Sequence, residues 1–157
     1  MRTFSTAWLV TFDGHLARLF RCRRSIDTAH PTTWTLREMG AIANDWENLQ
    51  EHRRPTLAGG SPGTHHAVGV NHGPEEEARR FMRDLAAWLE ARCSEWKLGQ
   101  LLVCANPRGI GSLRAAATPF LSSRIVEIPA ELASLRESEL AEHPAVASAL
   151  AGLGSLA

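Results

Sequence analysis

The stretch that decides the fold runs from residue 71 to residue 114 and reads NHGPEEEARRFMRDLAAWLEARCSEWKLGQLLVCANPRGIGSLR. Pro74 suits the first turn of a helix, and the three glutamates after it place negative charge at the same end. This pattern predicts a long helix capped by Gly73. Apolar residues at three- and four-residue spacing give the helix one face for a core. They are Ala78, Phe81, Met82, Leu85, Trp88 and Leu89.

The run 101–105, LLVCA, is apolar without polar alternation, which is typical of a strand covered on both faces. It predicts a central strand in a sheet flanked by helices. After a turn through Pro107 and Arg108, a second helix is expected from about Gly111 to Ala117. Because ligands of open α/β sheets usually bind at the carboxyl ends of strands, we expect any site to lie where this strand ends.

The residues near the start of the chain favour an antiparallel meander. Residues 7–12 are rich in β-formers, and Asp13-Gly14 is a strong hairpin signal. Residues 15–22 alternate in polarity, and residues 33–39 do so again after a loop. Three hairpin-linked strands are therefore expected before the long helix.

Glycine, proline and adjacent histidines interrupt the pattern ahead of that helix. We expect a glycine-rich loop over about 52–72, which is either functional or disordered, as loops of this length usually are. Towards the end of the chain, a strand is expected over 124–128. Helical segments should follow over 134–150, kinked or divided at Pro144. Residues 152–157 are expected to fray.

The elements give the order β-β-β-α-β-α-β-α in a single α/β domain of 157 residues, with a mixed sheet and flanking helices. This order is ribonuclease-H-like. Cys22, Cys93 and Cys104 lie far apart without metal-ligand spacing, so reduced and mostly buried thiols are expected. A chain of this size can bury a core without disulfides or a metal.

Charge and hydropathy limit the classes of partner. Seventeen basic and seventeen acidic residues balance, which gives no general attraction to nucleic acid or to an anionic membrane. The apolar segment near the N-terminus is too short for a signal peptide or a membrane span. A cytoplasmic protein without membrane insertion is therefore expected.

Candidate catalytic groups are isolated in the sequence. A nuclease of this topology needs several carboxylates, and Asp13 stands without partners, so we interpret it as a turn residue. His65, His66 and His72 share no fixed face, which favours solvated or locally bonded side chains over a metal site or a general base. Ser61 lacks the strand-to-helix elbow of an activated serine. No catalytic residue, metal or cofactor is predicted.

The arginines offer another kind of site. Arg108 stands close to a helix amino end, where it can bind an anion or pair with a structural carboxylate, and the sequence leaves both open. The glycines near it match no phosphate-loop motif. Arg79 and Arg80 are spaced for ion pairs with Glu75 and Glu76, which favours a solvated face over an RNA-binding stripe.

Several short motifs resemble the bacterial host attachment protein family. They are Gly73-Pro74 followed by acids, Ala78-Arg79-Arg80-Phe81, the strand 101–105, Pro107-Arg108-x-x-Gly111-x-Leu113-Arg114, Glu131-Leu132-x-Ser134-Leu135, Glu139-Leu140-x-x-His143, and His66-Ala67 ahead of the helix. The resemblance covers most of the chain. The family is similar to the middle domain of archaeal and eukaryotic peptide-chain release factors, in which a Gly-Gly-Gln loop helps water to attack the peptidyl-tRNA ester.

The resemblance implies a ribosome- or RNA-associated role in translation rescue or hibernation, with the ribosome or tRNA as partner. Serine stands where those release factors have glutamine, so a non-catalytic domain is favoured. The contact residues implied are Gly59, Gly60, Ser61, His65, His66, Arg108 and Arg114. The alternative is a protein-interaction or anion-binding domain tied to host attachment or stress, with a protein partner and no ribosomal role.

Overall fold

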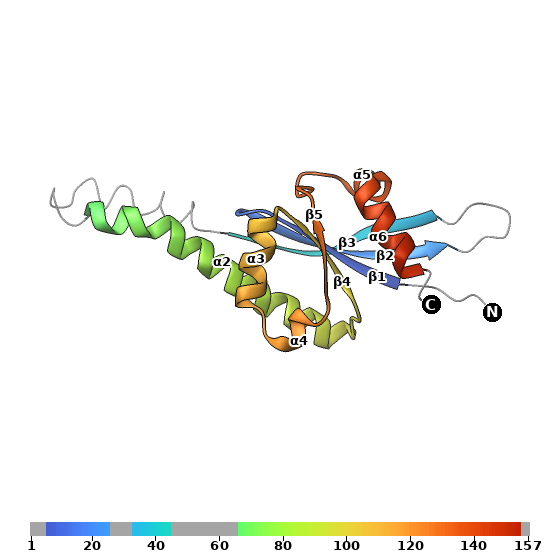
Figure 1. Cartoon of the computed structure of the whole chain (residues 1–157), viewed down its shortest axis with the longest axis horizontal. Coiled ribbons are helices and arrows are strands. Elements are labelled where there is room, and N and C mark those ends of the chain that lie inside the picture. Colours follow the sequence, from blue (N-terminus) through green and yellow to red (C-terminus); the bar gives the residue numbers. More distant parts are fainter. Residues whose placement is uncertain (1–5, 26–32, 45–65, 155–157) are drawn as a thin grey trace.

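A single mixed sheet organises the computed structural model, which describes residues 6–25, 33–44 and 66–154 (Figure 1). The strands lie in the order β3-β2-β1-β4-β5. β1 and β2 pair antiparallel, as do β2 and β3, whereas β4 runs parallel to both β1 and β5. The strands are β1 (Thr6–Phe12), β2 (Leu16–Ser25), β3 (Thr33–Ala43), β4 (Leu101–Ala105) and β5 (Ile125–Pro129). The predicted mixed sheet is confirmed.

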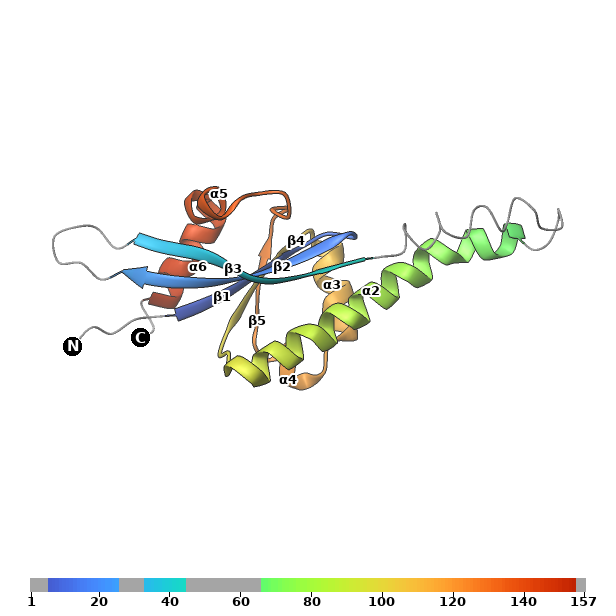
Figure 2. The same cartoon turned by 180° about the vertical axis from the view of Figure 1, so that it is seen from behind.

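Helices cover both faces of this sheet (Figures 1 and 2). They are α2 (His66–Trp96), α3 (Pro107–Ala116), α4 (Pro119–Ser122), α5 (Glu137–Glu142) and α6 (Pro144–Gly154). The first three lie on one face, and α5 and α6 lie on the other. The short helix α4 was not predicted, and Pro144 divides the last helical segment as expected.

Two apolar clusters fill the layers, and alternation along the strands assigns residues to them. On β1, Val10 and Phe12 face α2, whereas Ala7 and Leu9 face α5 and α6. All of β4 is buried, because its residues pack alternately against the helices of the two faces. This explains the absence of polar alternation in β4 and confirms the prediction of a strand covered on both faces.

The long helix α2 begins earlier than predicted. It starts at His66, so Gly73 is not its cap, Pro74 lies inside it, and residues 66–72 are not the expected loop. Proline removes one backbone donor from a helix interior. The glutamates after Pro74 are typical of a first helical turn, which is why the sequence predicted the helix to start there. The amino-terminal turns of α2 extend beyond the sheet (Figures 1 and 2).

The apolar stripe of α2 is confirmed with one exception. Phe81, Leu85 and Leu89 are buried, and Trp88 is half-buried against the same cluster. The exception is Ala78, which is exposed.

Other boundaries shift by a few residues. The helix α3 starts at Pro107 rather than near Gly111, since Asn106 supplies its cap. The helix α6 continues to Gly154, past the point where fraying was expected. Residues 45–65 and 155–157 lie outside the described residues. The three cysteines are free and buried, as predicted.

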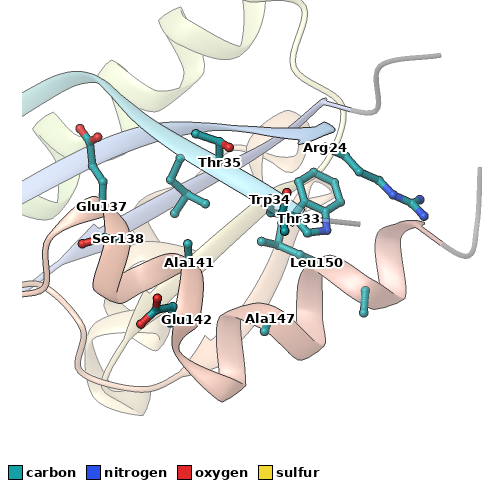
Figure 3. Close-up of a pocket in the computed structure, with 12 residues that line it drawn as sticks. Arg24, Thr33, Trp34, Thr35, Glu137, Ser138, Ala141, Glu142, Ala147 and Leu150 are labelled. Carbon is teal, nitrogen blue, oxygen red and sulfur yellow. The ribbon is translucent and has the colours of Figure 1, made fainter. Parts of the chain in front are cut away.

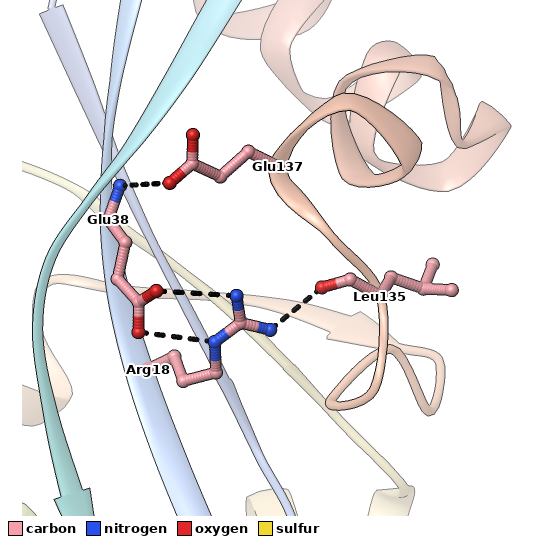
Figure 4. A network of polar contacts seen from close by, with 4 residues as sticks. All are labelled: Arg18, Glu38, Leu135 and Glu137. Carbon is pink, nitrogen blue, oxygen red and sulfur yellow. Dashed lines mark hydrogen bonds and ion pairs between the residues drawn. The ribbon is translucent and has the colours of Figure 1, made fainter.

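A polar clamp fastens α5 to the strands β2 and β3 (Figure 4). Arg18 Nε donates to Glu38 Oε1 at 3.2 Å, and Arg18 Nη1 donates to the carbonyl oxygen of Leu135 at 2.8 Å. The backbone N–H of Glu38 donates to Glu137 Oε1 at 3.0 Å. The side chains of Arg18 and Glu38 are only 17% and 34% exposed, so the clamp is partly shielded from water.

Across the described residues, every helix falls short of the length or the apolarity that a bilayer-crossing segment needs.

Candidate functional site

A hollow of about 600 Å³ opens where β1 and β4 end. These strands are parallel neighbours, and the chain leaves them in opposite directions, from β1 to β2 and from β4 through α3 to β5. Such a divergence is the usual ligand position in an open α/β sheet. The location predicted from the sequence therefore coincides with a hollow.

The floor of this hollow is apolar. Phe12 from β1, Phe81 and Met82 from α2, and Ala105 from β4 line it, and all four are buried. Gly109 lies against them at the start of α3. A Cβ atom at this glycine would lie 3.3 Å from the Phe12 ring, so the close approach of α3 depends on the missing side chain.

Three arginines stand around the floor. Arg79 and Arg83 come from α2 and Arg108 comes from α3, and all three are exposed. None of their side chains forms an ion pair or a hydrogen bond with another residue in the described part of the chain. Among the lining residues Asp13 is the one carboxylate, so the local balance is three positive charges against one negative charge. We call this site the basic hollow.

Asp13 already has structural partners. Its Oδ1 atom accepts the backbone N–H of His15 at 2.7 Å and that of Leu16 at 2.9 Å. The carboxylate therefore shapes the β1–β2 turn, which confirms the interpretation of Asp13 as a turn residue. This leaves the arginines as the groups that can recruit a ligand.

The predicted ion pairs on α2 do not form. Arg80 pairs instead with Glu77, at 3.8 Å between Nη1 and Oε1, and Glu75 and Glu76 are exposed. Arg79 is thus available to the hollow. Arg79 and Arg80 are both exposed, as expected of a solvated face, although the ion pairs with Glu75 and Glu76 are absent.

A signal for Arg79 and Arg83 does exist in the sequence. The two residues stand four positions apart, so they share one side of the helix, where like charges destabilise it. An unfavourable pair beside an apolar stripe is a reason to look for a ligand that neutralises it.

The amino end of α3 adds little further binding capacity. Asn106 caps the helix, its Oδ1 accepting the N–H of Gly109 at 2.6 Å, and its Nδ2 atom donates to Glu131 at 3.1 Å. Pro107 has no backbone donor. The guanidinium groups, rather than the helix terminus, are therefore the main anion-binding groups.

The other predicted site residues either have partners elsewhere or lie outside the described part of the chain. Arg114 donates from Nε to the carboxylate of Glu127 and is not among the lining residues. Gly59, Gly60, Ser61 and His65 lie outside the described residues. His66 is the first residue of α2. Of the predicted contacts, the structure places Arg108 at this site.

The chemistry of the basic hollow suits anions. Within the described residues, no three His, Cys, Asp or Glu side chains gather as metal ligands. One guanidinium group can donate two parallel hydrogen bonds to two oxygens of a carboxylate or a phosphate. Of these two anions, phosphate carries more negative charge. A phosphate-bearing ligand matches the three arginines best.

Comparison with known families agrees with the motifs of the sequence. A family model described as "Protein required for attachment to host cells" matches residues 8–143. The chain belongs to this family. The match takes in both sides of the basic hollow, because it runs from β1 through α2, β4 and α3. Comparison with curated proteins finds no match. The relation of this host attachment family to release factors stays a prediction.

Proposed function

We propose that this member of the host attachment family is a non-catalytic, cytoplasmic domain that contacts RNA on the ribosome through the basic hollow. The observation that carries the proposal is the convergence of Arg79, Arg83 and Arg108 on one apolar floor, without ion-pair partners among the described residues. Three cations that line one hollow, with no ion-pair partner among the described residues, repel one another, and a phosphate group relieves that repulsion.

The size of the hollow favours one nucleotide at a time. A volume of about 600 Å³ is in the range of small-molecule pockets and is too small for a duplex. Single-stranded RNA offers such a unit, with a phosphate for the guanidinium groups and a base that can cover the apolar floor. A loop or an end of ribosomal RNA or tRNA therefore fits better than a helix.

The neutral net charge fits a local contact. Phosphate contacts supply most of the affinity for nucleic acid, and each one makes binding weaker as salt rises. With 17 basic and 17 acidic residues, the chain as a whole does not attract RNA. Binding should therefore depend on the three arginines of the basic hollow rather than on a broad surface.

The ribosomal setting rests on the resemblance to the middle domain of release factors. Gly59-Gly60-Ser61 corresponds to the Gly-Gly-Gln loop of those factors, with serine where the glutamine would be. The loss of that glutamine argues for a domain that occupies or probes the ribosome without releasing the nascent chain. A role in rescue or hibernation is consistent with such a contact.

Co-sedimentation with ribosomes across a salt series tests this function. We expect the wild-type chain to co-sediment at low salt, and the variant Arg79→Ala/Arg83→Ala/Arg108→Ala to stay in the supernatant. The matched control is Arg37→Ala/Arg80→Ala/Arg136→Ala, which removes the same charge from exposed positions outside the hollow. Equal sedimentation of the two triple variants, or none by the wild type, would refute the proposal.

A second candidate is an anion-binding domain for attachment or stress without a ribosomal role. The pocket-like size of the basic hollow favours it, since a free nucleotide fills such a site as well as one held in RNA. This alternative predicts arginine-dependent binding of mononucleotides and no co-sedimentation with ribosomes. The same variants therefore distinguish the two.

A further inference from the structure

A second hollow lies on the opposite face of the sheet, between the edge strand β3 and the helices α5 and α6 (Figure 3). Its volume is about 860 Å³. Trp34 and Leu36 from β3 and Leu150 from α6 form an apolar wall, and they belong to the cluster beneath α5 and α6. We call it the β3 groove. It shares no lining residue with the basic hollow.

The backbone of β3 is open along this groove. β3 is the last strand on its side of the sheet. The N–H of Glu38 donates to Glu137 of α5, so it points away from β2. In an antiparallel pair this direction repeats every second residue, so the amide groups of Leu36 and Trp34 point outward as well. Neither of those two residues has a hydrogen bond outside the sheet among the described residues.

The open edge has a defined end. Glu137 occupies the outward N–H of Glu38, and α5 packs against β3 at that point (Figure 4). An added strand can therefore pair with β3 over Thr33–Arg37 and no further. The two outward residues offer a donor and an acceptor each, which is enough to hold a short extended segment.

The charges of the β3 groove are separated along its length. Figure 3 shows Glu137 and Glu142 on α5 at one end and Arg24 beside Trp34 at the other. The side chain of Glu142 is exposed and has no ion pair or hydrogen bond with a described residue, whereas Arg24 is engaged in another contact. The groove therefore has an acidic end, where Glu142 lacks an ion-pair partner among the described residues, next to apolar side chains.

We propose that the β3 groove binds an extended peptide segment that adds a strand to β3 and carries one apolar and one basic side chain, two positions apart. Alternate side chains of a strand point to the same face, so both enter the groove. The apolar side chain packs between Trp34 and Leu150, and the basic side chain reaches Glu142 and the unbonded oxygen of Glu137. The peptide backbone pairs with Trp34 and Leu36.

A probe peptide tests the proposal on the full chain. The probe has seven residues, with leucine third, lysine fifth and threonine elsewhere, and it carries a fluorescent label for anisotropy. We expect saturable binding with a Kd between about 10 μM and 1 mM. In nitrogen-15 NMR spectra, the amides of Trp34 and Leu36 should shift and become protected from exchange. Absence of saturable binding up to about 1 mM would overturn the proposal.

Methylation of the probe's amides tests strand addition directly. Successive amides of a strand point to opposite edges, so N-methyl groups at positions three and five block one edge, and N-methyl groups at positions four and six block the other. We expect one methylated probe to lose binding and the other to keep it. Equal binding by the two methylated probes would show that the backbone does not pair with β3.

Charge variants test the recognition of the lysine. Glu137→Gln/Glu142→Gln should weaken binding of the lysine probe about fivefold, in keeping with exposed ion pairs, and leave a probe with glutamine in place of lysine unaffected. Glu75→Gln/Glu76→Gln on α2 removes the same charge far from the groove and serves as control. An equal effect of both double variants, or self-association of the chain through β3 in place of peptide binding, would contradict the proposal.

Discussion

The two faces of one sheet carry hollows of opposite character. The basic hollow lies at the carboxyl ends of β1 and β4, and its exposed arginines Arg79, Arg83 and Arg108 lack counter-ions among the described residues. The β3 groove lies at the sheet's edge, with Glu137 and Glu142 at one end. Both have apolar floors, so the sign of the charge is what distinguishes their ligands.

The net charge of the chain is zero, yet each of the two hollows has a charge of its own. Seventeen positive and seventeen negative residues cancel over the whole chain. Within each hollow they do not, because screening by salt limits an exposed charge to a range of about 8–10 Å. A chain without net charge can therefore hold an anion on one face of its sheet and a cation on the other.

Charge reversal at the basic hollow should have the largest effect on ligand binding. The variant Arg79→Glu/Arg83→Glu/Arg108→Glu places three carboxylates where phosphate would bind, and like charges at close range cost several kcal/mol. We expect single-stranded RNA to bind at least about 100-fold more weakly in fluorescence anisotropy. The probe peptide should bind the β3 groove as before. If the variant binds neither ligand, the two regions are not independent.

Alkaline pH tests the face under α5 and α6. Burial raises the pKa of Cys22 and Cys104 from 9.0 to about 12, and both thiols lie in that cluster. They stay protonated in the folded chain while the unfolded chain ionises. The contribution of the two protonated thiols to the free energy of unfolding is therefore fully present below pH 9. It falls as the pH rises towards 12, by up to about 1.4 kcal/mol per thiol and pH unit.

Urea unfolding at about pH 8 and about pH 10 measures this fall. The variant Cys22→Ala/Cys104→Ala, although less stable at neutral pH, should lose less free energy of unfolding between the two pH values. The same loss in variant and wild type would show that other groups cause it.

Of the two binding sites, loosening the polar clamp should affect only the β3 groove. Arg18→Met removes the ion pair with Glu38 and the hydrogen bond to Leu135. Because the clamp is partly exposed, we expect a loss of about 1–2 kcal/mol in urea unfolding and weaker binding of the probe peptide. RNA binding should not change. Arg136→Met, at a side chain that is 89% exposed, should leave stability unchanged.

A pair of glycines in α3 tests how tightly this helix packs on the floor of the basic hollow. An added Cβ at Gly109 meets Phe12 and Asn106 at 3.3 Å, whereas one at Gly111 meets nothing within 4 Å. Gly111→Ala should stabilise the helix by about 0.5–1 kcal/mol. Gly109→Ala should lose that gain to overpacking against the floor and be less stable than Gly111→Ala by about 1–2 kcal/mol. Thermal unfolding compares the two, and equal stabilities would show that α3 can move away from Phe12.

Sequence periodicity sufficed for the strands. Alternating polarity predicted β2 and β3, and its absence predicted β4, because these patterns follow from which faces are covered. The hairpin at Asp13-Gly14 was visible because short polar side chains shape turns locally. The expectation that a site lies at the carboxyl end of β4 followed from the predicted order of strands and helices alone.

The sequence did not predict the features that depend on how distant elements pack together. The glutamates after Pro74 satisfy the rules for a helix start, although α2 continues through the proline. Arg79 has Glu75 at ion-pair spacing, and only the position of α2 across the end of β1 shows that the arginine lines the hollow instead. The β3 groove has no motif, because it arises where α5 and α6 meet an edge strand.

The salt dependence of binding to single-stranded RNA shows whether the basic hollow is a phosphate site. Three phosphate contacts predict that the logarithm of the binding constant falls with the logarithm of salt concentration with a slope of about −2. For Arg79→Ala/Arg83→Ala/Arg108→Ala, any residual binding should have a slope near zero. A triple variant that binds RNA as tightly as the wild type, with the same slope, would contradict the assignment of the basic hollow as the phosphate site.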